Sequence, residues 1–148
     1  MEKLIFRPMT QGDAEIAAAL DLRCFGARDA CSQKYFFNVA QDERQEFLVA
    51  EYDGKLIACA GAEIFNDTAE IESLAVTPEY RRLGAAKILL AKLLGAITKR
   101  GATFIVLEVR PSNKAAIELY KNFGFQIVER EKDYYWNEDA WIMAREFN

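Results

Sequence analysis

The segment Arg81-Arg82-Leu83-Gly84-Ala85-Ala86 separates a predicted strand from a predicted helix, and the hydrophobic pattern changes its period there. Before it, Glu70 to Val76 has the residue types of a strand, and after it apolar residues recur at helical spacing from Gly84 to Arg100. The helical segment is amphipathic, with lysines between the apolar positions, and Gly101 is placed to end it. The sequence therefore predicts a strand, a glycine turn and a helix in succession.

The glycine turn has the features of an anion-binding site. Gly84 lets the backbone turn tightly, and the first amides of the following helix have no intrahelical partners. The positive end of the helix dipole adds to this site, and Arg81, Arg82 and Lys87 reinforce it, so a pyrophosphate would fit there. A solvated basic loop with a glycine at its bend is the simpler alternative. Such a string arises by chance in roughly one chain of this length in six, so alone it carries little weight.

Other elements are predicted outward from this turn in both directions. Asp53-Gly54 separates two strand-like segments and is a strong hairpin signal, while Thr10 and Asp13 have capping-box spacing. Thr103 to Val109 is nearly continuously apolar, as in a central strand covered on both faces, and Ser112 is placed to cap the next helix. Predicted strands cover residues 4–7, 46–52, 55–65, 70–76, 103–109, 125–129 and 140–147, and predicted helices cover residues 10–25, 29–40, 84–100 and 113–123. The order βααβββαβαββ predicts an α/β (α+β) chain with helices packed against a mixed sheet.

The composition is that of one ordinary globular domain, residues 1–148. Hydrophobic residues make up 51% and charged residues 28%, which excludes disorder. The net charge of -4 argues against a general nucleic-acid binder, which needs a basic surface. No apolar stretch approaches the ~20 residues of a membrane span, and the N-terminus lacks the apolar core of a secretory signal. We therefore expect a cytoplasmic protein without direct contact to nucleic acid or membrane; the oligomeric state stays open.

The chain contains no histidine, and its three cysteines, Cys24, Cys31 and Cys59, lack Cys-x-x-Cys spacing. Zinc sites of the Cys/His type, Ser-His-Asp triads and Cys-His dyads all need an imidazole, so these chemistries are excluded. The odd number of cysteines argues against a disulfide framework, and free thiols are normal in a reducing compartment. Any acid or base must therefore be Asp, Glu, Tyr, Lys or Cys, and we expect no metal.

Glu108 is the first candidate for acid–base chemistry, because it shares a strand face with Phe104 and Val106 in an otherwise apolar run. A buried carboxyl group is costly unless it is paired, and burial shifts carboxyl groups toward the pKa range of a general base. The alternative is that Glu108 lies at the strand end and pairs with Arg110 or another cation. Glu72, on the preceding strand, is a rival with the same two interpretations.

Three further polar or aromatic features have both a structural and a chemical interpretation. Tyr120 has helical spacing to other apolar residues and could be a core aromatic with its hydroxyl at the rim. Asn113 could be a first-turn polar residue of its helix. Tyr134-Tyr135-Trp136 precedes Asn137-Glu138-Asp139, and such clusters are typical of hairpin packing rather than of ligand cages.

Taken in order, these motifs resemble the GNAT superfamily of acyl-CoA-dependent N-acetyltransferases over nearly the whole chain. The Arg-x-x-Gly-x-Ala loop follows the strand that ends Leu74-Ala75-Val76-Thr77-Pro78, and Leu107-Glu108-Val109-Arg110 comes later. The segment 112–120 then follows. This second half, including Asp133-Tyr134-Tyr135 and Glu138-Asp139-Ala140, is similar in particular to the RimI-like ribosomal-protein-alanine N-acetyltransferases.

The resemblance implies a single GNAT-like domain with a mixed, mostly antiparallel sheet of about seven strands flanked by four helices. It also implies transfer of an acetyl group from the co-substrate acetyl-CoA to a primary amine. The first choice of acceptor is the N-terminal amine of a protein, such as a ribosomal protein. An α-amino group with a pKa of ~7.7 to 8.0 is partly neutral at pH 7, whereas a lysine costs about 3.5 kcal/mol more to deprotonate than at its pKa. A lysine or small-molecule acetyltransferase is the nearest alternative, and a non-catalytic acyl-CoA-binding domain is the alternative from another class.

The resemblance assigns a role to each matched residue. Glu108 acts as the base, with Glu72 as a second carboxylate on a strand where other branches place theirs, and Tyr120 protonates the leaving thiolate. With reference pKa values of about 10 for tyrosine and about 8.5 for a thiol, that transfer is uphill by roughly 2 kcal/mol. Tyr120 therefore needs a lowered pKa or acts mainly as a hydrogen-bond donor. The residues implied to bind acetyl-CoA are Leu74, Ala75 and Val76 through their backbone, Arg82, Leu83, Gly84, Ala85, Ala86 and Lys87 at the pyrophosphate, and Asn113.

The resemblance also places the substrates relative to the sheet. Binding of the diphosphate by the glycine turn is expected to place the reactive sulfur between two splayed central strands. A strand amide near Leu74 is expected to stabilise the oxyanion there. Ala86 stands where the last glycine of the loop is more frequent. The acceptor groove is expected to be shaped by residues 25–35 and by the hairpin around residues 134–137.

Overall fold

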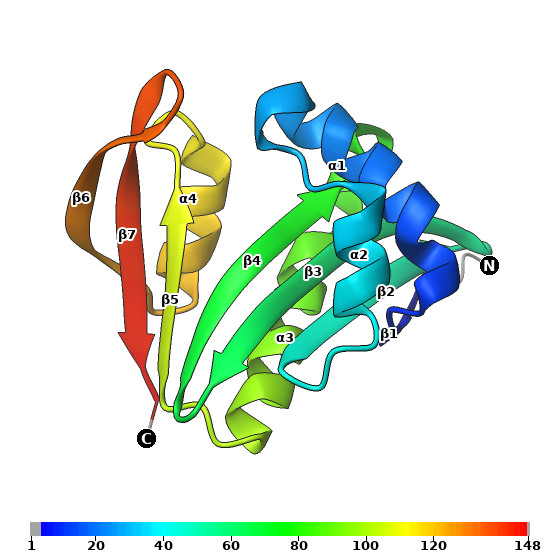
Figure 1. Ribbon diagram of the computed structural model, residues 1–148, viewed down its shortest axis with the longest axis horizontal. Coiled ribbons are helices and arrows are strands. Elements are labelled where there is room, and N and C mark those ends of the chain that lie inside the picture. The colour runs from blue at the N-terminus through cyan, green and yellow to red at the C-terminus, as the bar shows by residue number, and fades with distance from the viewer. Residues whose placement is uncertain (1–3, 148) are drawn as a thin grey trace.

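The computed structural model describes residues 4–147, apart from the side chain of Arg82, and its element order is the predicted one. Seven strands form one sheet in the order β1-β2-β3-β4-β5-β7-β6 (Figure 1). The strands are β1 (Leu4–Pro8), β2 (Gln45–Tyr52), β3 (Lys55–Phe65), β4 (Thr68–Val76), β5 (Phe104–Val109), β6 (Gln126–Tyr135) and β7 (Glu138–Glu146). The helices are α1 (Ala14–Asp29), α2 (Gln33–Val39), α3 (Ala85–Lys99) and α4 (Lys114–Asn122), with short 3-10 turns η1 (Gln11–Asp13) and η2 (Pro78–Leu83).

The sheet is mixed and mostly antiparallel, which confirms the expected fold class. Within residues 4–147, the pairing of β4 with β5 is parallel and the other strand pairings are antiparallel. Asp53-Gly54 joins β2 to β3, and both residues have the positive φ that a tight hairpin needs. The backbone N–H of Thr10 donates to Asp13 at 2.8 Å, so the capping-box pair forms at the start of η1.

The sheet separates two hydrophobic clusters. On one face, α3 buries Leu89 and Leu93 against Ile105 and its neighbours on β5. On the other face, α1 and α2 bury Leu20 and Phe36 over β2, β3 and β4. Figure 1 shows α3 and α4 on one side of the sheet and α1 and α2 on the other. None of the helices in the described part of the chain is long and apolar enough to cross a membrane.

The parallel strands β4 and β5 separate beyond Glu70. Their register runs from the pair Thr68–Phe104 to the pair Glu70–Val106, although both strands continue further. On its other side, β4 shifts register against β3, and Glu72 is left without a Cα partner, as in a β-bulge. Figure 1 shows the resulting gap between β4 and β5 opening toward the end of α1. We call this gap the split.

The first two helices differ from their predicted ranges, because a short helical segment follows Gly26 and the second helix starts later. The predicted end at about Phe25 falls directly before Gly26, whose φ of 81° and ψ of 169° are not helical, and a short segment after this kink continues α1 to Asp29. One hydrogen-bonded turn follows the kink, since the N–H of Ala30 donates to the Gly26 carbonyl at 3.0 Å. The second helix begins at Gln33 rather than at Asp29. After the kink, Asp29 lies beside the end of the split that opens toward α1.

The predicted cap of α4 is also wrong. Asn113, not Ser112, is the capping residue, and its Oδ1 accepts the N–H of Ala116 at 3.2 Å. The Ser112 hydroxyl donates instead to Glu138 at 2.9 Å. The Ser112 hydroxyl therefore bonds to a side chain of the neighbouring hairpin instead of capping α4.

The second half of the sheet is less covered than its apolar sequence suggests. The expectation that β5 is covered on both faces is wrong: Ile105, Leu107 and Val109 are buried, but Phe104 is exposed and Glu108 is half-buried. β6 is longer than the predicted segment 125–129 and almost wholly exposed. It is an edge strand of mainly polar residues, so no apolar alternation marks its length.

Candidate active site

Two cavities meet in the split between β4 and β5. The larger cavity has a volume of about 600 Å³ and lies between β4, the start of α3 and α4. The smaller cavity has a volume of about 230 Å³ and lies between β4, β5, the end of α1 and the β6–β7 hairpin. The residues that line both cavities are Phe25, Asp29, Leu74, Arg110, Asn113 and Ala116. A molecule in the larger cavity can therefore reach a molecule in the smaller one.

The larger cavity brings together most of the residues predicted to bind acetyl-CoA. They are Leu74, Ala75, Val76, Gly84, Ala86, Lys87 and Asn113. Of the remaining three, Leu83 is exposed on η2, Ala85 is buried beneath the turn, and the side chain of Arg82 lies outside the described part of the structure. The Ala85 side chain is thus part of the core, and its contribution to a ligand would be its backbone amide.

The start of α3 has the geometry of an anion site. Gly84 has φ of 76°, a left-handed conformation that favours glycine, and the N–H of Ile88 donates to its carbonyl at 3.1 Å. The amides of residues 85–87 precede this bond and so have no partner within the helix. The first turn carries no acidic residue, and Lys87 is exposed at the cavity. Arg81 is less free than expected, because its Nε donates to the Val76 carbonyl at 3.2 Å. These residues fit a diphosphate group.

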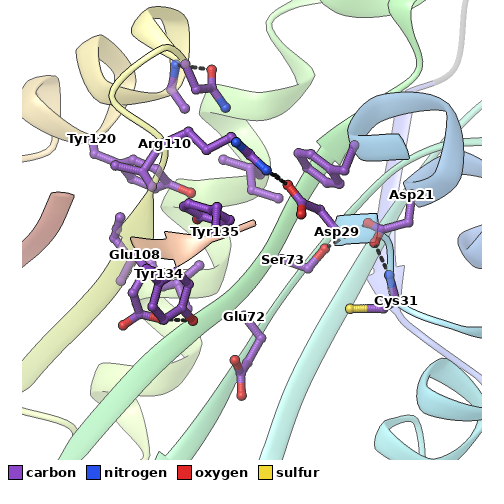
Figure 2. A pocket seen from close by; sticks show the side chains of 17 residues that line it. Asp21, Asp29, Cys31, Glu72, Ser73, Glu108, Arg110, Tyr120, Tyr134 and Tyr135 are labelled. Carbon is purple, nitrogen blue, oxygen red and sulfur yellow. Dashed lines mark hydrogen bonds and ion pairs between the residues drawn. The ribbon is translucent and has the colours of Figure 1, made fainter. Parts of the chain in front are cut away.

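Glu108 lines the smaller cavity, where its hydrogen-bond partner is Tyr134. The Tyr134 hydroxyl donates to Oε1 of Glu108 at 3.1 Å (Figure 2). The alternative pairing of Glu108 with Arg110 is not what the structure has, because Arg110 is bound to Asp29 and Glu138. Desolvation, and then the Glu108 carboxylate, raises the pKa of Tyr134, so this phenol stays a donor.

Glu72 lines the same cavity from the opposite strand (Figure 2). Although solvent reaches Glu72, partial desolvation followed by the charges of Glu70 and Glu63 raises its pKa to about 7. Glu70, two residues earlier on β4, is not a lining residue of this cavity, and desolvation followed by the hydrogen bond and charge of Glu108 raises the pKa of Glu70 to about 7. Both candidate bases, Glu108 on β5 and Glu72 on β4, therefore line one cavity.

Tyr120 is buried at the wall of the smaller cavity, with 6% of its surface exposed. Its ring packs edge-on against Phe125 at a centroid distance of 5.8 Å, so it is also the core aromatic of the simpler interpretation. Burial raises the pKa of Tyr120 above the usual value of a phenol. The sequence analysis left two alternatives for Tyr120, a phenol of lowered pKa or a residue that acts mainly as a hydrogen-bond donor. The raised pKa favours the hydrogen-bond donor.

Two residues of the site were not singled out from the sequence. Asp21, on α1, is 2% exposed and lines the smaller cavity, where it accepts the Cys31 N–H at 2.7 Å and the Ser73 hydroxyl at 3.4 Å. The position of Asp21 directly after the buried Leu20 is the sequence feature that could have identified it as a site residue. Arg110 was considered only as a partner for Glu108, and nothing local in the sequence indicates its contacts with α1 and the hairpin.

A split parallel pair of strands with an anion site at the following helix defines a class of acyl-CoA-dependent acyltransferases. Residues 14–125 match the model of the Acetyltransferase (GNAT) family, which is more than half of the chain. The chain belongs to this family.

Relatives with known activities support the same class. The chain is 39% identical over 108 residues to the ribosomal protein bS18-alanine N-acetyltransferase of Escherichia coli, covering 70% of this chain and 73% of that protein. The crystal structure of the ribosomal-protein-S18-alanine N-acetyltransferase from Escherichia coli superposes with a TM-score of 0.89 at 32% identity, covering 99% of this chain and 95% of that one. The structure of the PaiA N-acetyltransferase of Thermoplasma acidophilum in complex with coenzyme A has a TM-score of 0.82 at 20% identity, covering 98% and 99%, and shows a common fold.

Residues 4–147 contain no group of three or more His, Cys, Asp or Glu side chains that could hold a metal ion. Cys24, Cys31 and Cys59 are free thiols, of which Cys59 is buried. Cys24 lines the larger cavity and Cys31 the smaller one.

Proposed function

We propose that this protein transfers the acetyl group of acetyl-CoA to the N-terminal amine of a protein, such as a ribosomal protein. The observation that carries the proposal is the meeting of the two cavities in the split, with an anion site at the far end of one and carboxylates in the other. The activity named for the Escherichia coli relative supports the choice of acceptor. Acetyl-CoA is the co-substrate, and no step of the reaction requires a metal.

The larger cavity is the proposed acetyl-CoA site. The amides at the start of α3, together with Lys87 and Arg82, would hold the pyrophosphate. Backbone groups of residues 74–76 would bind the pantetheine arm, and Asn113 lies where it can contact both substrates. This threading would bring the thioester to the junction of the cavities, where the Leu74 amide is the proposed oxyanion donor.

Glu108 is the proposed base. It would take a proton from the amine, directly or through water, as the nitrogen attacks the thioester carbonyl. Its bond to Tyr134 orients the carboxylate at the wall of the smaller cavity. Glu72 lines the same cavity and is the alternative base.

Tyr120 is the proposed acid at the leaving sulfur. As the new C–N bond forms, the C–S bond breaks and the electron pair goes to sulfur as thiolate. Because burial raises its pKa, Tyr120 keeps its proton and stabilises the thiolate by donating a hydrogen bond, and the released thiolate takes its proton from water.

The chain is proposed to act as one catalytic domain in the cytoplasm. All seven strands of residues 4–147 share one sheet, which supports a single domain. Three free cysteines are in keeping with a reducing compartment. A protein that acetylates ribosomal proteins would meet its substrates there.

The test is a competition among three acceptors with labelled acetyl-CoA: an Ala-starting peptide, a lysine peptide with a blocked N-terminus, and a polyamine. We expect label in the Ala-starting peptide, and none when its α-amine is acetylated in advance. Preference for the lysine peptide or the polyamine would overturn the choice of acceptor. Binding of acetyl-CoA without turnover of any acceptor would instead indicate a non-catalytic acyl-CoA-binding domain.

A further inference from the structure

Arg110 lies where the two cavities meet, and separate segments of the chain bind its side chain. Its Nη2 and Nε lie 2.7 and 2.8 Å from Oδ2 of Asp29, at the end of α1. Its Nη1 lies 2.5 Å from Oδ1 of Asn137 and 3.1 Å from Oε1 of Glu138 in the β6–β7 hairpin. The guanidinium also lies 4.2 Å from the ring centroid of Tyr135. Arg110 thus joins α1 to the hairpin across the split, and Figure 2 shows its bond to Asp29 spanning the pocket.

A second contact joins the same two segments, but it is more exposed. Arg28, next to Asp29, lies over the ring of Trp136 at 4.5 Å from the centroid, and Trp136 is 63% exposed. Exposed cation–π contacts contribute little. The side chains of Arg110 and Asp29 are each only 20% exposed, and their pair is part of a network, which strengthens it relative to an isolated surface pair. The Arg110–Asp29 pair is therefore the main tie between α1 and the hairpin.

The two segments that this pair joins are the walls of the smaller cavity. The α1 side contributes Phe25 and Cys31, and the hairpin contributes Tyr134 and Tyr135. Arg110 and Asp29 also line the larger cavity, but their hydrogen bonds and ion pairs go to each other and to the hairpin rather than to Gly84 or Lys87 at its diphosphate end. A change in the pair should therefore alter the acceptor side of the site more than the cofactor side.

We propose that Arg110 and Asp29 are positioning residues for the acceptor, which hold the end of α1 and the β6–β7 hairpin at a fixed separation over the thioester. Neither side chain takes part in the bond changes. The walls are then set before the acceptor arrives, which lowers the entropy lost on binding. Fixed walls also limit the access of water, which would otherwise attack the thioester carbonyl and release acetate and coenzyme A. This inference rests on the proposed function.

The test compares four variants with the wild-type protein. Asp29→Asn removes the charge but keeps the shape of the side chain. Arg110→Lys keeps the charge but loses the planar guanidinium, which donates hydrogen bonds to several oxygen atoms at once. Asp29→Glu is the conservative variant. Arg130→Ala is the matched control, because Arg130 pairs with Asp139 at 3.5 Å in the same hairpin and neither residue lines either cavity.

The kinetic readouts are the KM for an Ala-starting peptide, the KM for acetyl-CoA, and the release of coenzyme A without an acceptor. For Asp29→Asn and Arg110→Lys we expect the peptide KM to rise about tenfold and acceptor-free hydrolysis to increase severalfold. The KM for acetyl-CoA should stay within about twofold, and Asp29→Glu should recover most of the loss. Equal changes in both KM values, or effects no larger than those of Arg130→Ala, would overturn the proposal.

An activity-free readout separates this proposal from the proposed function. Amide hydrogen exchange should quicken at residues 26–31 and 134–138 in Asp29→Asn, and should stay at the wild-type rate in Arg130→Ala. If the wild-type protein acetylates none of the acceptors, the proposed function fails while the exchange data still test the tie. If amide exchange in Asp29→Asn is unchanged at both segments, the Arg110–Asp29 pair does not hold α1 and the hairpin together. This conclusion does not depend on the acetyltransferase activity of the variant.

Discussion

The hydroxyl of Tyr134 donates a hydrogen bond of 3.1 Å to Oε1 of Glu108, so a residue of the β6–β7 hairpin holds a carboxylate of β5 (Figure 2). The two residues lie 26 positions apart and come from strands that are not neighbours in the sheet, since β7 lies between them. The proposed base is thus oriented by an element whose position the Arg110 network also controls.

Removal of this bond should weaken catalysis without changing the fold. In Tyr134→Phe we expect kcat to fall by about tenfold, because the Glu108 carboxylate loses its fixed orientation. Tyr135→Phe is the matched control, since the ring that Arg110 stacks on is retained. Steady-state kinetics on an Ala-starting peptide measure both variants. Equal losses in the two would mean that the hydroxyl of Tyr134 has no special role.

Glu108→Gln should cost far more activity than Glu72→Gln. Loss of a general base lowers kcat by about 10²- to 10⁴-fold, and glutamine keeps the shape and part of the hydrogen bonding of the side chain. We expect Glu72→Gln to stay within about threefold of the wild-type protein, because Glu72 then contributes only charge to the cavity. Rapid-quench or coupled assays at saturating acetyl-CoA provide kcat. The reverse order of the two losses would assign the base to Glu72.

Tyr120→Phe should lower turnover but not cofactor binding. The phenylalanine ring keeps the edge-on packing against Phe125, so the fold should be retained. Because the pKa of Tyr120 is raised, we expect the loss of a hydrogen-bond donor to the thiolate, with a fall in kcat of roughly tenfold or more. Isothermal titration with coenzyme A is the control measurement. An unchanged kcat would remove Tyr120 from the mechanism.

Lys87→Ala should weaken coenzyme A binding. Lys87 is exposed at the start of α3, where a phosphate group would sit, so we expect the Kd to rise by about three- to tenfold at low salt. The difference from the wild-type protein should shrink as the salt concentration rises, because the charges are solvent-accessible. Lys99→Ala, at the other end of the same helix, is the control. If both variants bind coenzyme A equally well, the diphosphate lies elsewhere.

Glu70→Gln should stabilise the protein at alkaline pH. Desolvation and the neighbouring Glu108 raise the pKa of Glu70 to about 7, against 4.5 for an unperturbed glutamate, so the folded state holds this proton more tightly than the unfolded chain. Ionisation of Glu70 therefore costs stability as the pH rises from about 4.5 to about 7. The variant should have a higher Tm than the wild-type protein at pH 8, with the difference vanishing below about pH 4.5.

Thermal unfolding across this pH range measures the effect, and Glu15→Gln on the exposed side of α1 serves as the control. A Tm difference that is the same at pH 4 and pH 8 would contradict a proton held by Glu70.

The element order could be predicted because periodicity, capping and turn chemistry are local. The change of period across residues 81–86, the Asp53-Gly54 turn and the run before Glu108 each act within a few residues, and the structure has the corresponding elements. Where the prediction fails, a tertiary contact competes with a local one. Glu138 takes the Ser112 hydroxyl, and the edge position of β6 removes the apolar alternation that would mark its length.

The sequence by itself determined the order of strands and helices, the glycine turn with its positively charged surroundings, and the absence of any imidazole chemistry. Only the tertiary structure decided that Glu108 and Glu72 line one cavity in the split and that Arg110 reaches Asp29, 81 residues away. The physical reason is that backbone preferences extend over one or two turns, whereas these side-chain pairings depend on where β4 and β5 part and on the kink at Gly26.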